Sequence, residues 1–273
     1  MSAIRIAVWN LEGLMSNSGD YDFIRHKKKI NRMLDWSYPK DGKKADLIFF
    51  QEISMKFGPL LPYRWFFCRE KVKEEGYCRG ILLYVDPDSG LAVDEPELPD
   101  RTNPVGACYT VRRQGQPEPL FRFAGFWNIP VEESKKQSVY LGHLEDMIRR
   151  LEIKKSGAVP YVIAGDTNVN LDSNVDNTGE NNPAKCGKRR KKLEDFLAQH
   201  GLALIGFDGT DGKVFSLDFV HSGKFFRCDL LMVSETIRSQ IDFLIPGCDP
   251  ATFASKLHSW DSDHIPLVFD LTL

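Results

Sequence analysis

The segment Tyr161-Val162-Ile163-Ala164-Gly165-Asp166-Thr167-Asn168 carries the clearest structural signal in the chain. An apolar run leads directly into a glycine, a carboxylate and an amide, which is typical of a buried strand that ends at a loop. A second segment of this kind is Ser262-Asp263-His264-Ile265-Pro266, where an acid and an imidazole precede the apolar run 265–273. Carboxylate, amide and imidazole groups together can hold a hard cation and handle a proton. We therefore expect one site assembled from distant parts of the chain.

Apolar runs and turn residues predict the other strands and helices. The expected strands are 4–9, 45–50, 80–85, 108–112, 120–127, 161–164, 226–233 and 265–273. The expected helices are 23–36, 139–151 and 189–200, and the polar stretches 87–104 and 170–185 are expected to be irregular. Strands outnumber helices, and continuous apolar strands indicate sheets that are covered on a face. A two-sheet core flanked by helices fits this order best.

The composition limits what the protein can be. Its 273 residues are 42% hydrophobic and 27% charged, enough for one large core, and we expect a single domain over residues 1–273. The formal net charge is −2, so no global positive field attracts nucleic acid and any basic surface must be local. With no signal-peptide pattern and no apolar stretch of membrane-spanning length, a soluble cytoplasmic protein is expected. Its six cysteines form no CxxC pair, which argues against a zinc site.

Polar residues follow the predicted strands in a distinctive order along the chain. The series is Trp9-Asn10-Leu11-Glu12, Gln51-Glu52, Trp127-Asn128-Ile129-Pro130, Gly165-Asp166-Thr167-Asn168, Arg227-Cys228-Asp229 and Ser262-Asp263-His264. It resembles the endonuclease/exonuclease/phosphatase superfamily over nearly the whole chain. The resemblance implies a four-layer α/β sandwich, in which two mixed β-sheets pack face to face and helices flank them. It also implies a metal-dependent phosphoester hydrolase.

The resemblance assigns a role to each matching residue. Glu52 corresponds to the main carboxylate ligand of Mg²⁺, or of Mn²⁺ as a substitute, and Asn10, Glu12 and Asp263 correspond to its neighbours around the metal. Asp166 corresponds to the residue that activates or positions the attacking water, and Asn168 to a phosphate contact beside it. His264 corresponds to the proton-handling imidazole, paired with Asp229. This set suits Mg²⁺, because that ion prefers oxygen ligands and keeps several waters.

One position departs from the family pattern. Many members have His-Leu-Pro after the mid-chain strand, whereas this chain has Asn128-Ile129-Pro130. An amide cannot shuttle a proton, but it can donate a hydrogen bond. We therefore expect Asn128 to donate to a phosphoryl oxygen and His264 to be the only catalytic imidazole.

The basic run Lys185 to Lys192 follows the long polar stretch after Asp166 and has two interpretations. It is either the solvated start of a helix or a contact for an anionic substrate. Cations at a helix N-terminus are unfavourable next to the positive end of the helix dipole. Their presence there favours the second interpretation, a contact with an anionic ligand. Under the second interpretation Lys188, Arg189 and Arg190 would bind phosphates without reading a base sequence.

Three functions fit these patterns. The first is a Mg²⁺-dependent phosphodiesterase acting on nucleic acid, as an endonuclease or an end-processing exonuclease. The second is a phosphomonoesterase or a lipid- or inositol-phosphate phosphatase on the same scaffold. The third is a catalytically weak binding protein, against which the intact Glu52, Asp166, Asn168, Asp263 and His264 argue. The motifs do not separate the first two functions, because the core residues are shared.

Overall fold

Strand β1 (Ile4–Asn10) is buried along its whole length and lies within the first of two mixed sheets. The computed structural model describes residues 3–10, 31, 34–35, 37, 41–54, 67–72, 77–96, 105–128, 136–151, 159–169, 171, 183–206, 229–244 and 266–273. The first sheet has the strand order β11-β12-β1-β2-β4-β3, in which β1 and β2 are parallel and the other pairs antiparallel. Its other strands are β2 (Leu47–Ser54), β3 (Phe67–Val72), β4 (Tyr77–Val85), β11 (Ile241–Leu244) and β12 (Leu267–Leu271).

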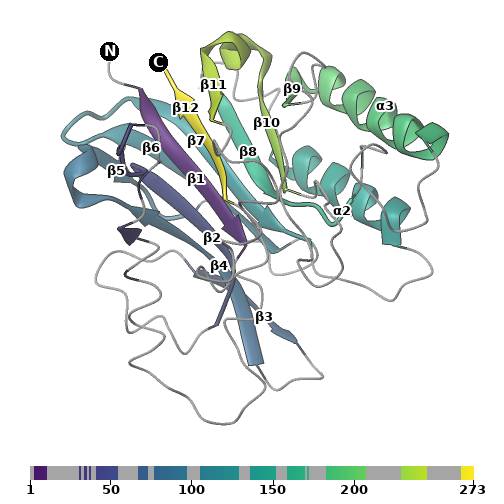
Figure 1. Cartoon of the computed structure of the whole chain (residues 1–273), viewed down its shortest axis with the longest axis horizontal. Coiled ribbons are helices and arrows are strands. Elements are labelled where there is room, and N and C mark those ends of the chain that lie inside the picture. Colours follow the sequence, from purple (N-terminus) through teal and green to yellow (C-terminus); the bar gives the residue numbers. More distant parts are fainter. Residues whose placement is uncertain are drawn as a thin grey trace.

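The second sheet has the order β5-β6-β7-β8-β10-β9, with β7 and β8 as its parallel pair. Its strands are β5 (Leu91–Val93), β6 (Val105–Arg113), β7 (Pro119–Trp127), β8 (Tyr161–Asp166), β9 (Leu202–Ile205) and β10 (Asp229–Ser234). Figure 1 shows the two sheets stacked, with β1 and β12 of the first lying over β7 and β8 of the second. The carboxyl ends of both parallel pairs lie at the same edge of the sandwich. Ligands bind at such strand ends in α/β folds.

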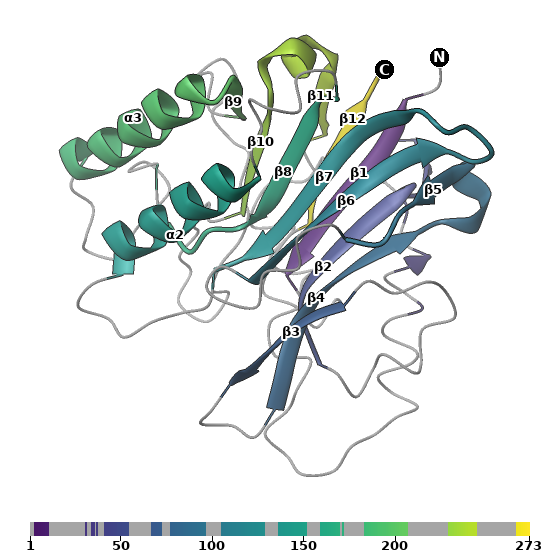
Figure 2. The ribbon, with the colours of Figure 1, turned by 180° about the vertical axis from the view of Figure 1, so that it is seen from behind.

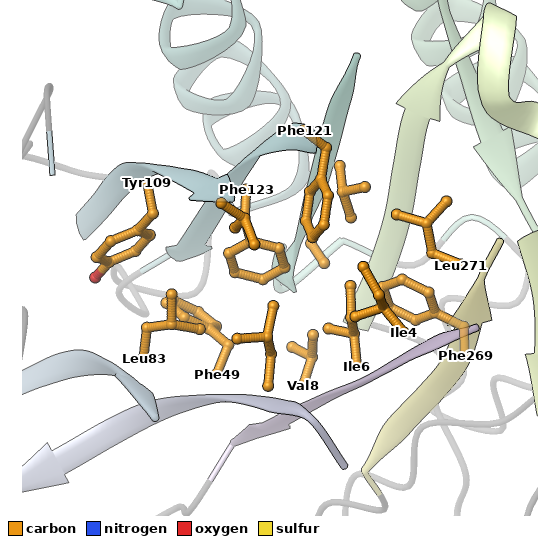
Figure 3. Packing of buried hydrophobic residues seen from close by; sticks show 14 of the residues in the cluster. Ile4, Ile6, Val8, Phe49, Leu83, Tyr109, Phe121, Phe123, Phe269 and Leu271 are labelled. Carbon is orange, nitrogen blue, oxygen red and sulfur yellow. The ribbon is translucent and has the colours of Figure 1, made fainter. Parts of the chain in front are cut away.

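The main core fills the space between the sheets. Aliphatic and aromatic side chains from β1, β2, β6, β7 and β12 point toward one another there (Figure 3). The rings of Phe49 and Phe123 lie 5.5 Å apart at 58°, a tilted geometry that aromatic pairs favour. Phe49 also occupies the place where a side chain of residue 125 would be, since a Cβ on Gly125 would lie 2.2 Å from its ring. Glycine at this position therefore lets the two sheets approach.

Helices α2 (Lys136–Arg150) and α3 (Pro183–Gln199) lie side by side on the outer face of the second sheet (Figures 1 and 2). A second core lies beneath them and includes Leu144 and Ile148 of α2 and Leu193 and Leu197 of α3. Two 3₁₀ turns are also described, η2 (Pro87–Ser89) and η5 (Glu235–Gln240). Neither described helix is long and apolar enough to cross a membrane.

The predicted α/β sandwich of two mixed sheets packed face to face is confirmed. The predicted helix 23–36 lies almost wholly outside the described residues. The stretch 87–104 was expected to be irregular but contains β5, a short edge strand. Strands β3, β9 and β11 were not expected either, and they are also outer strands of the sheets. Helix α3 begins at Pro183, six residues before the predicted start, so the basic run lies inside the helix.

Arg5 is a buried cation on the central strand β1, with 2% of its surface exposed. Its guanidinium donates to Asp270 on β12 at 2.8 Å from two nitrogens and to both carboxylate oxygens of Asp41. The hydrogen bond from Arg5 holds the pKa of Asp41 well below its usual range. This contribution to stability is complete above pH about 4, the ordinary aspartate pKa, and is lost as the pH falls toward the lowered value.

We expect Asp270→Asn to lower the free energy of unfolding by roughly 2–3 kcal/mol. Losing one partner of a buried pair costs about 3–5 kcal/mol, and Asp270 is 16% exposed, which reduces the loss. Urea titration at pH 7 measures it. Asp242→Asn is the matched control, because Asp242 is the exposed neighbour of Asp270 on β11. Equal effects of the two substitutions would contradict the role given to the Arg5 pair.

Candidate active site

Asn10, the last residue of β1, joins the two sheets at one edge of the sandwich. Its Nδ2 donates to Glu52 Oε1 of the first sheet at 3.1 Å and to Asp166 Oδ2 of the second at 3.0 Å. The three side chains are almost completely buried, with 1%, 5% and 2% of their surfaces exposed respectively. The structure thus brings together three of the residues that the sequence predicted for one site.

Glu52 reaches Asn10 because strand β2 is irregular at this point. Phe50 pairs with Leu82 and Ile53 pairs with Gly80, so Gln51 and Glu52 together oppose one residue of β4. This is a β-bulge, a feature that re-aims side chains next to active sites. Glu52 also has a positive φ of 55°, which is uncommon for a residue with a long side chain. Such strain persists only where the surroundings enforce it, and it often marks a functional site.

The turn after β8 is held by its own polar side chains. Asp166 Oδ1 accepts from the backbone N–H of Asn168 at 2.8 Å, and Thr167 Oγ1 accepts from Val169 N at 3.2 Å. Asn168 has a φ of 51°, and asparagine tolerates this left-handed region better than most residues. Gly165 is required for a different reason. A Cβ there would lie 1.9 Å from the carbonyl oxygen of Phe126 on β7.

Asp229 lies beside Asp166 in the second sheet. The two residues are direct partners in the antiparallel pairing of β10 with β8, so their side chains share one face of the sheet. Trp127 of β7 is the partner of Asp166 on its other side and belongs to the core between the sheets. The row Trp127, Asp166 and Asp229 therefore faces the first sheet. Asp229 is 2% exposed, and its pairing with His264 lies outside the described residues.

Asn128 has a different environment from the one expected. Its Nδ2 donates to the carbonyl oxygen of Thr167 at 3.0 Å and to that of Tyr140 on α2 at 3.4 Å. Both amide hydrogens are thus directed to the protein backbone. The backbone carbonyl of Asn128 accepts from Asn168 Nδ2 at 2.7 Å. This arrangement ties the turn after β8 to the end of β7 and to α2, and it directs no donor of Asn128 to a phosphoryl oxygen.

Asn168 was expected to contact phosphate. Its Nδ2 donates to the carbonyl oxygen of Asn128 and, at 3.2 Å, to Asp166 Oδ2. Together with Asn10, it brings a second amide to this carboxylate oxygen. The described contacts of the Asn168 amide therefore orient Asp166.

The predicted basic residues Lys188, Arg189 and Arg190 lie in the first half of α3, away from the carboxylates. Arg190 Nε forms an ion pair with Glu194 Oε1 at 2.7 Å. Lys188 is exposed and Arg189 is half-buried. The other predicted site residues, Glu12, Asp263 and His264, lie outside the described residues, so their positions stay predictions.

Gln51 belongs to the series of polar residues at the strand ends, but the sequence predicted no role for it. Its Oε1 accepts the backbone N–H of Asp166 at 3.2 Å, a second link between the sheets beside Asn10. The side chain is fully buried, and its Nε2 has no hydrogen-bond partner among the described residues. An amide directly after the apolar run Leu47 to Phe50 was the available signal, because a buried polar group needs a partner.

The donor set fits a magnesium ion better than an enclosed metal site. Among the described residues, no three His, Cys, Asp or Glu side chains are placed to hold a metal by themselves. Mg²⁺ needs only one or two carboxylates and keeps several waters, so Glu52 with the Asn10 amide oxygen would suffice. The neighbouring buried carboxylates Asp166 and Asp229 favour a cation here, because burying negative charge is costly.

We expect Gln51→Met to lower the free energy of unfolding by about 1–3 kcal/mol, since the buried Asp166 N–H loses its acceptor. Amide hydrogen exchange would show faster exchange at Asp166. Leu47→Met is the matched control at the opposite end of β2, and it should leave exchange at Asp166 unchanged. Unaltered protection of Asp166 in Gln51→Met would show that the side chain does not hold β8.

Comparison with known proteins places this fold. No family model and no curated protein sequence matches the chain. Solved structures do, including the human Nocturnin catalytic domain with bound sulfate, at 16% identity and a TM-score of 0.62 over 99% of this chain and 94% of that one. TDP2 of D. rerio complexed with a single-strand DNA product matches at 14% identity and a TM-score of 0.61 over 100% of both chains. The endonuclease domain of TRAS1, a telomere-specific non-LTR retrotransposon, matches at 17% identity and a TM-score of 0.56 over 99% of both chains. At these identities the likeness establishes architecture, and the chain has the fold of the endonuclease/exonuclease/phosphatase superfamily.

Proposed function

We propose that this chain is a Mg²⁺-dependent phosphodiesterase that hydrolyses phosphoester bonds in nucleic acid, as an endonuclease or an end-processing exonuclease. The observation that carries the proposal is the buried link from Asn10 to Glu52 and Asp166, which joins a carboxylate of each sheet at one edge. Residues from four strands, β1, β2, β8 and β10, meet there. Glu52 and Asn168, which have positive φ, lie at the same place. We propose that one domain, residues 1–273, carries this site.

Glu52 and Asn10 would hold the metal, with Glu12 and Asp263 completing its surroundings. Bound Mg²⁺, or Mn²⁺ in its place, neutralises charge on the phosphoryl oxygens and stabilises the leaving group. Asp166 orients the attacking water. Its two oxygens are fixed by the backbone of Asn168 and by the amides of Asn10 and Asn168, so little reorganisation is needed during reaction. Asn128 holds this turn in place instead of contacting phosphate.

Asp229 and His264 complete the proposed chemistry. An imidazole hydrogen-bonded to a carboxylate is fixed in one tautomer and favoured in its charged form, which suits it to stabilise a developing phosphorane or to protonate the leaving oxygen. Because Asp229 lies beside Asp166, an imidazole paired with Asp229 would lie on the same edge as the attacking water.

The structural neighbours support a nucleic acid as the substrate class. One is described as an endonuclease domain and another as a complex with a single-strand DNA product. A substrate panel with Mg²⁺ or Mn²⁺ tests this: plasmid DNA, single-stranded RNA, duplex DNA with an abasic site, and inositol phosphates. Turnover of the nucleic acids supports the proposal, and turnover of inositol phosphates alone would replace it with the phosphatase function.

We expect Glu52→Gln to reduce metal-supported turnover by more than the 10–100-fold typical of losing an outer partner of a metal site. Glutamine keeps the volume and the oxygen that accepts from Asn10 but removes the charge. Isothermal titration with Mg²⁺ should show weaker binding in parallel. Glu118→Gln, in the exposed turn between β6 and β7, is the control and should be unaffected. Full wild-type activity in excess chelator would contradict the metal mechanism.

We expect Asp229 and His264 to act as one unit. Asp229→Asn should lose much of the kcat that His264→Ala loses, and the double variant should be little worse than His264→Ala. Non-additivity of this kind is expected for residues that share one catalytic task. Steady-state kinetics of the three variants measures it, with thermal unfolding as the check on folding. Losses that simply multiply would show that the two residues act independently.

A further inference from the structure

Helices α2 and α3 run parallel, and two pairs of side chains join them. Lys192 Nζ of α3 lies 2.8 Å from Glu145 Oε1 of α2, and the guanidinium of Arg149 on α2 lies over the Phe196 ring at 5.1 Å. From the first contact to the second, the residue number rises by four in each helix, so the two helices run in the same direction. The flank of α3 that carries Lys192 and Phe196 therefore faces α2. Figure 2 shows the two helices side by side.

Three further cations lie on this flank. Lys185, Lys188 and Arg189 precede Lys192 by seven, four and three residues, which places them on the same side of the helix. None of them forms an ion pair with a residue in the described part of the chain, in contrast to Arg190, Lys191 and Lys192. We refer to Lys185, Lys188 and Arg189 as the α3 cationic flank.

The neighbouring part of α2 offers these cations no negative charge. Glu145 faces Lys192, so the residues three and seven positions earlier, Gly142 and Ser138, lie opposite Arg189 and Lys185. Gly142 has no side chain, and nothing lies within 4 Å of where its Cβ would be. As far as the described residues go, space and positive charge without an ion-pair partner therefore coincide in the first half of α3.

The α3 cationic flank and the carboxylates lie on different faces of the second sheet, because the helices cover its outer face whereas Trp127, Asp166 and Asp229 face the first sheet. The helix ends at Gln199, just before Leu202, which pairs with Ser234 at the end of β10 remote from Asp229. From Lys185 to Gln199 the helix rises about 21 Å, at about 1.5 Å per residue. The α3 cationic flank is therefore distant from the end of the helix that adjoins β9, and it is separate from the carboxylates.

We propose that the α3 cationic flank binds the phosphate backbone of a nucleic acid strand beyond the bond that is cleaved. This rests on the proposed function only for its substrate class. Lysine and arginine contacts to phosphates fix position without reading bases, and a phosphate near the start of a helix is also favoured by the helix dipole. The contact therefore adds affinity for long strands and leaves short substrates unaffected.

The test is binding in chelator, where no turnover is needed, by fluorescence anisotropy over a range of salt concentrations. The variant is Lys185→Gln/Lys188→Gln/Arg189→Gln. The matched control is Arg190→Gln/Lys191→Gln/Arg238→Gln, which removes the same charge from cations that have an ion-pair partner on their own helix. The probes are a single strand of about 20 nucleotides, longer than the roughly 4–16 of typical single-strand sites, and one of about 4.

For the long strand, the salt slope of log K should weaken by about 2 in the first variant, since each phosphate contact contributes about 0.7 on single strands. The control should change much less, and the short strand should bind all proteins alike. Equal slopes in both triple variants would overturn the proposal, and so would poly-glutamate binding as tightly as the strand. If the slope changes but no nucleic acid is hydrolysed, the flank stands and the proposed function fails. If nucleic acid is hydrolysed but the salt slope is unchanged, the proposed function stands and the role of the α3 cationic flank fails.

Discussion

The packing of Phe49 against Gly125 sets how closely the two sheets approach. A large ring on β2 fills the place of a missing side chain on β7, and Phe123 packs against the same ring. Interiors are dense, so this spacing is not freely adjustable. At that spacing a single asparagine at the end of β1 can reach carboxylates of both sheets. The site is therefore a consequence of the core, since its two halves come from different sheets whose spacing this packing sets.

Backbone strain is concentrated where the two halves meet. In the described part of the chain, the non-glycine residues with positive φ are Glu52 and Asn168, and both are at the site. The bulge at Gln51 and Glu52 removes regular pairing from β2 but turns a carboxylate toward Asn10. The loop after β8 is closed by hydrogen bonds from amides to Asp166. Strain of about 1–3 kcal/mol per residue is tolerated because the neighbouring sheets and hydrogen bonds fix these conformations.

Charge is divided between two regions of the protein. Buried carboxylates gather at the edge of the sandwich, whereas the α3 flank that faces α2 carries cations with no ion-pair partner in the described part of the chain. The net charge of −2 conceals this division. A metal ion is needed for an anionic substrate to bind beside the buried carboxylates, whereas the α3 cationic flank attracts such a substrate directly. The metal ion and the α3 cationic flank therefore have complementary roles in the proposed function. The buried Arg5 pair is a separate feature that stabilises the central strands of the first sheet.

The apolar runs and the polar residues that end them were sufficient to predict most of the central strands, both described helices, and the grouping of Asn10, Glu52 and Asp166. These signals are local: a buried strand must be apolar, and a ligand-binding strand end must be polar. The outer strands β5, β9 and β11 were missed because they are only three or four residues long, and β3 because its central residues Arg69, Glu70 and Lys71 are charged. The bulge, the role of Gln51 and the inward-turned amide of Asn128 depend on which strands are neighbours. No local pattern encodes that, because these contacts join residues distant in the sequence, 115 positions apart from Gln51 to Asp166 and 39 apart from Asn128 to Thr167, and exist only once the strands have packed together.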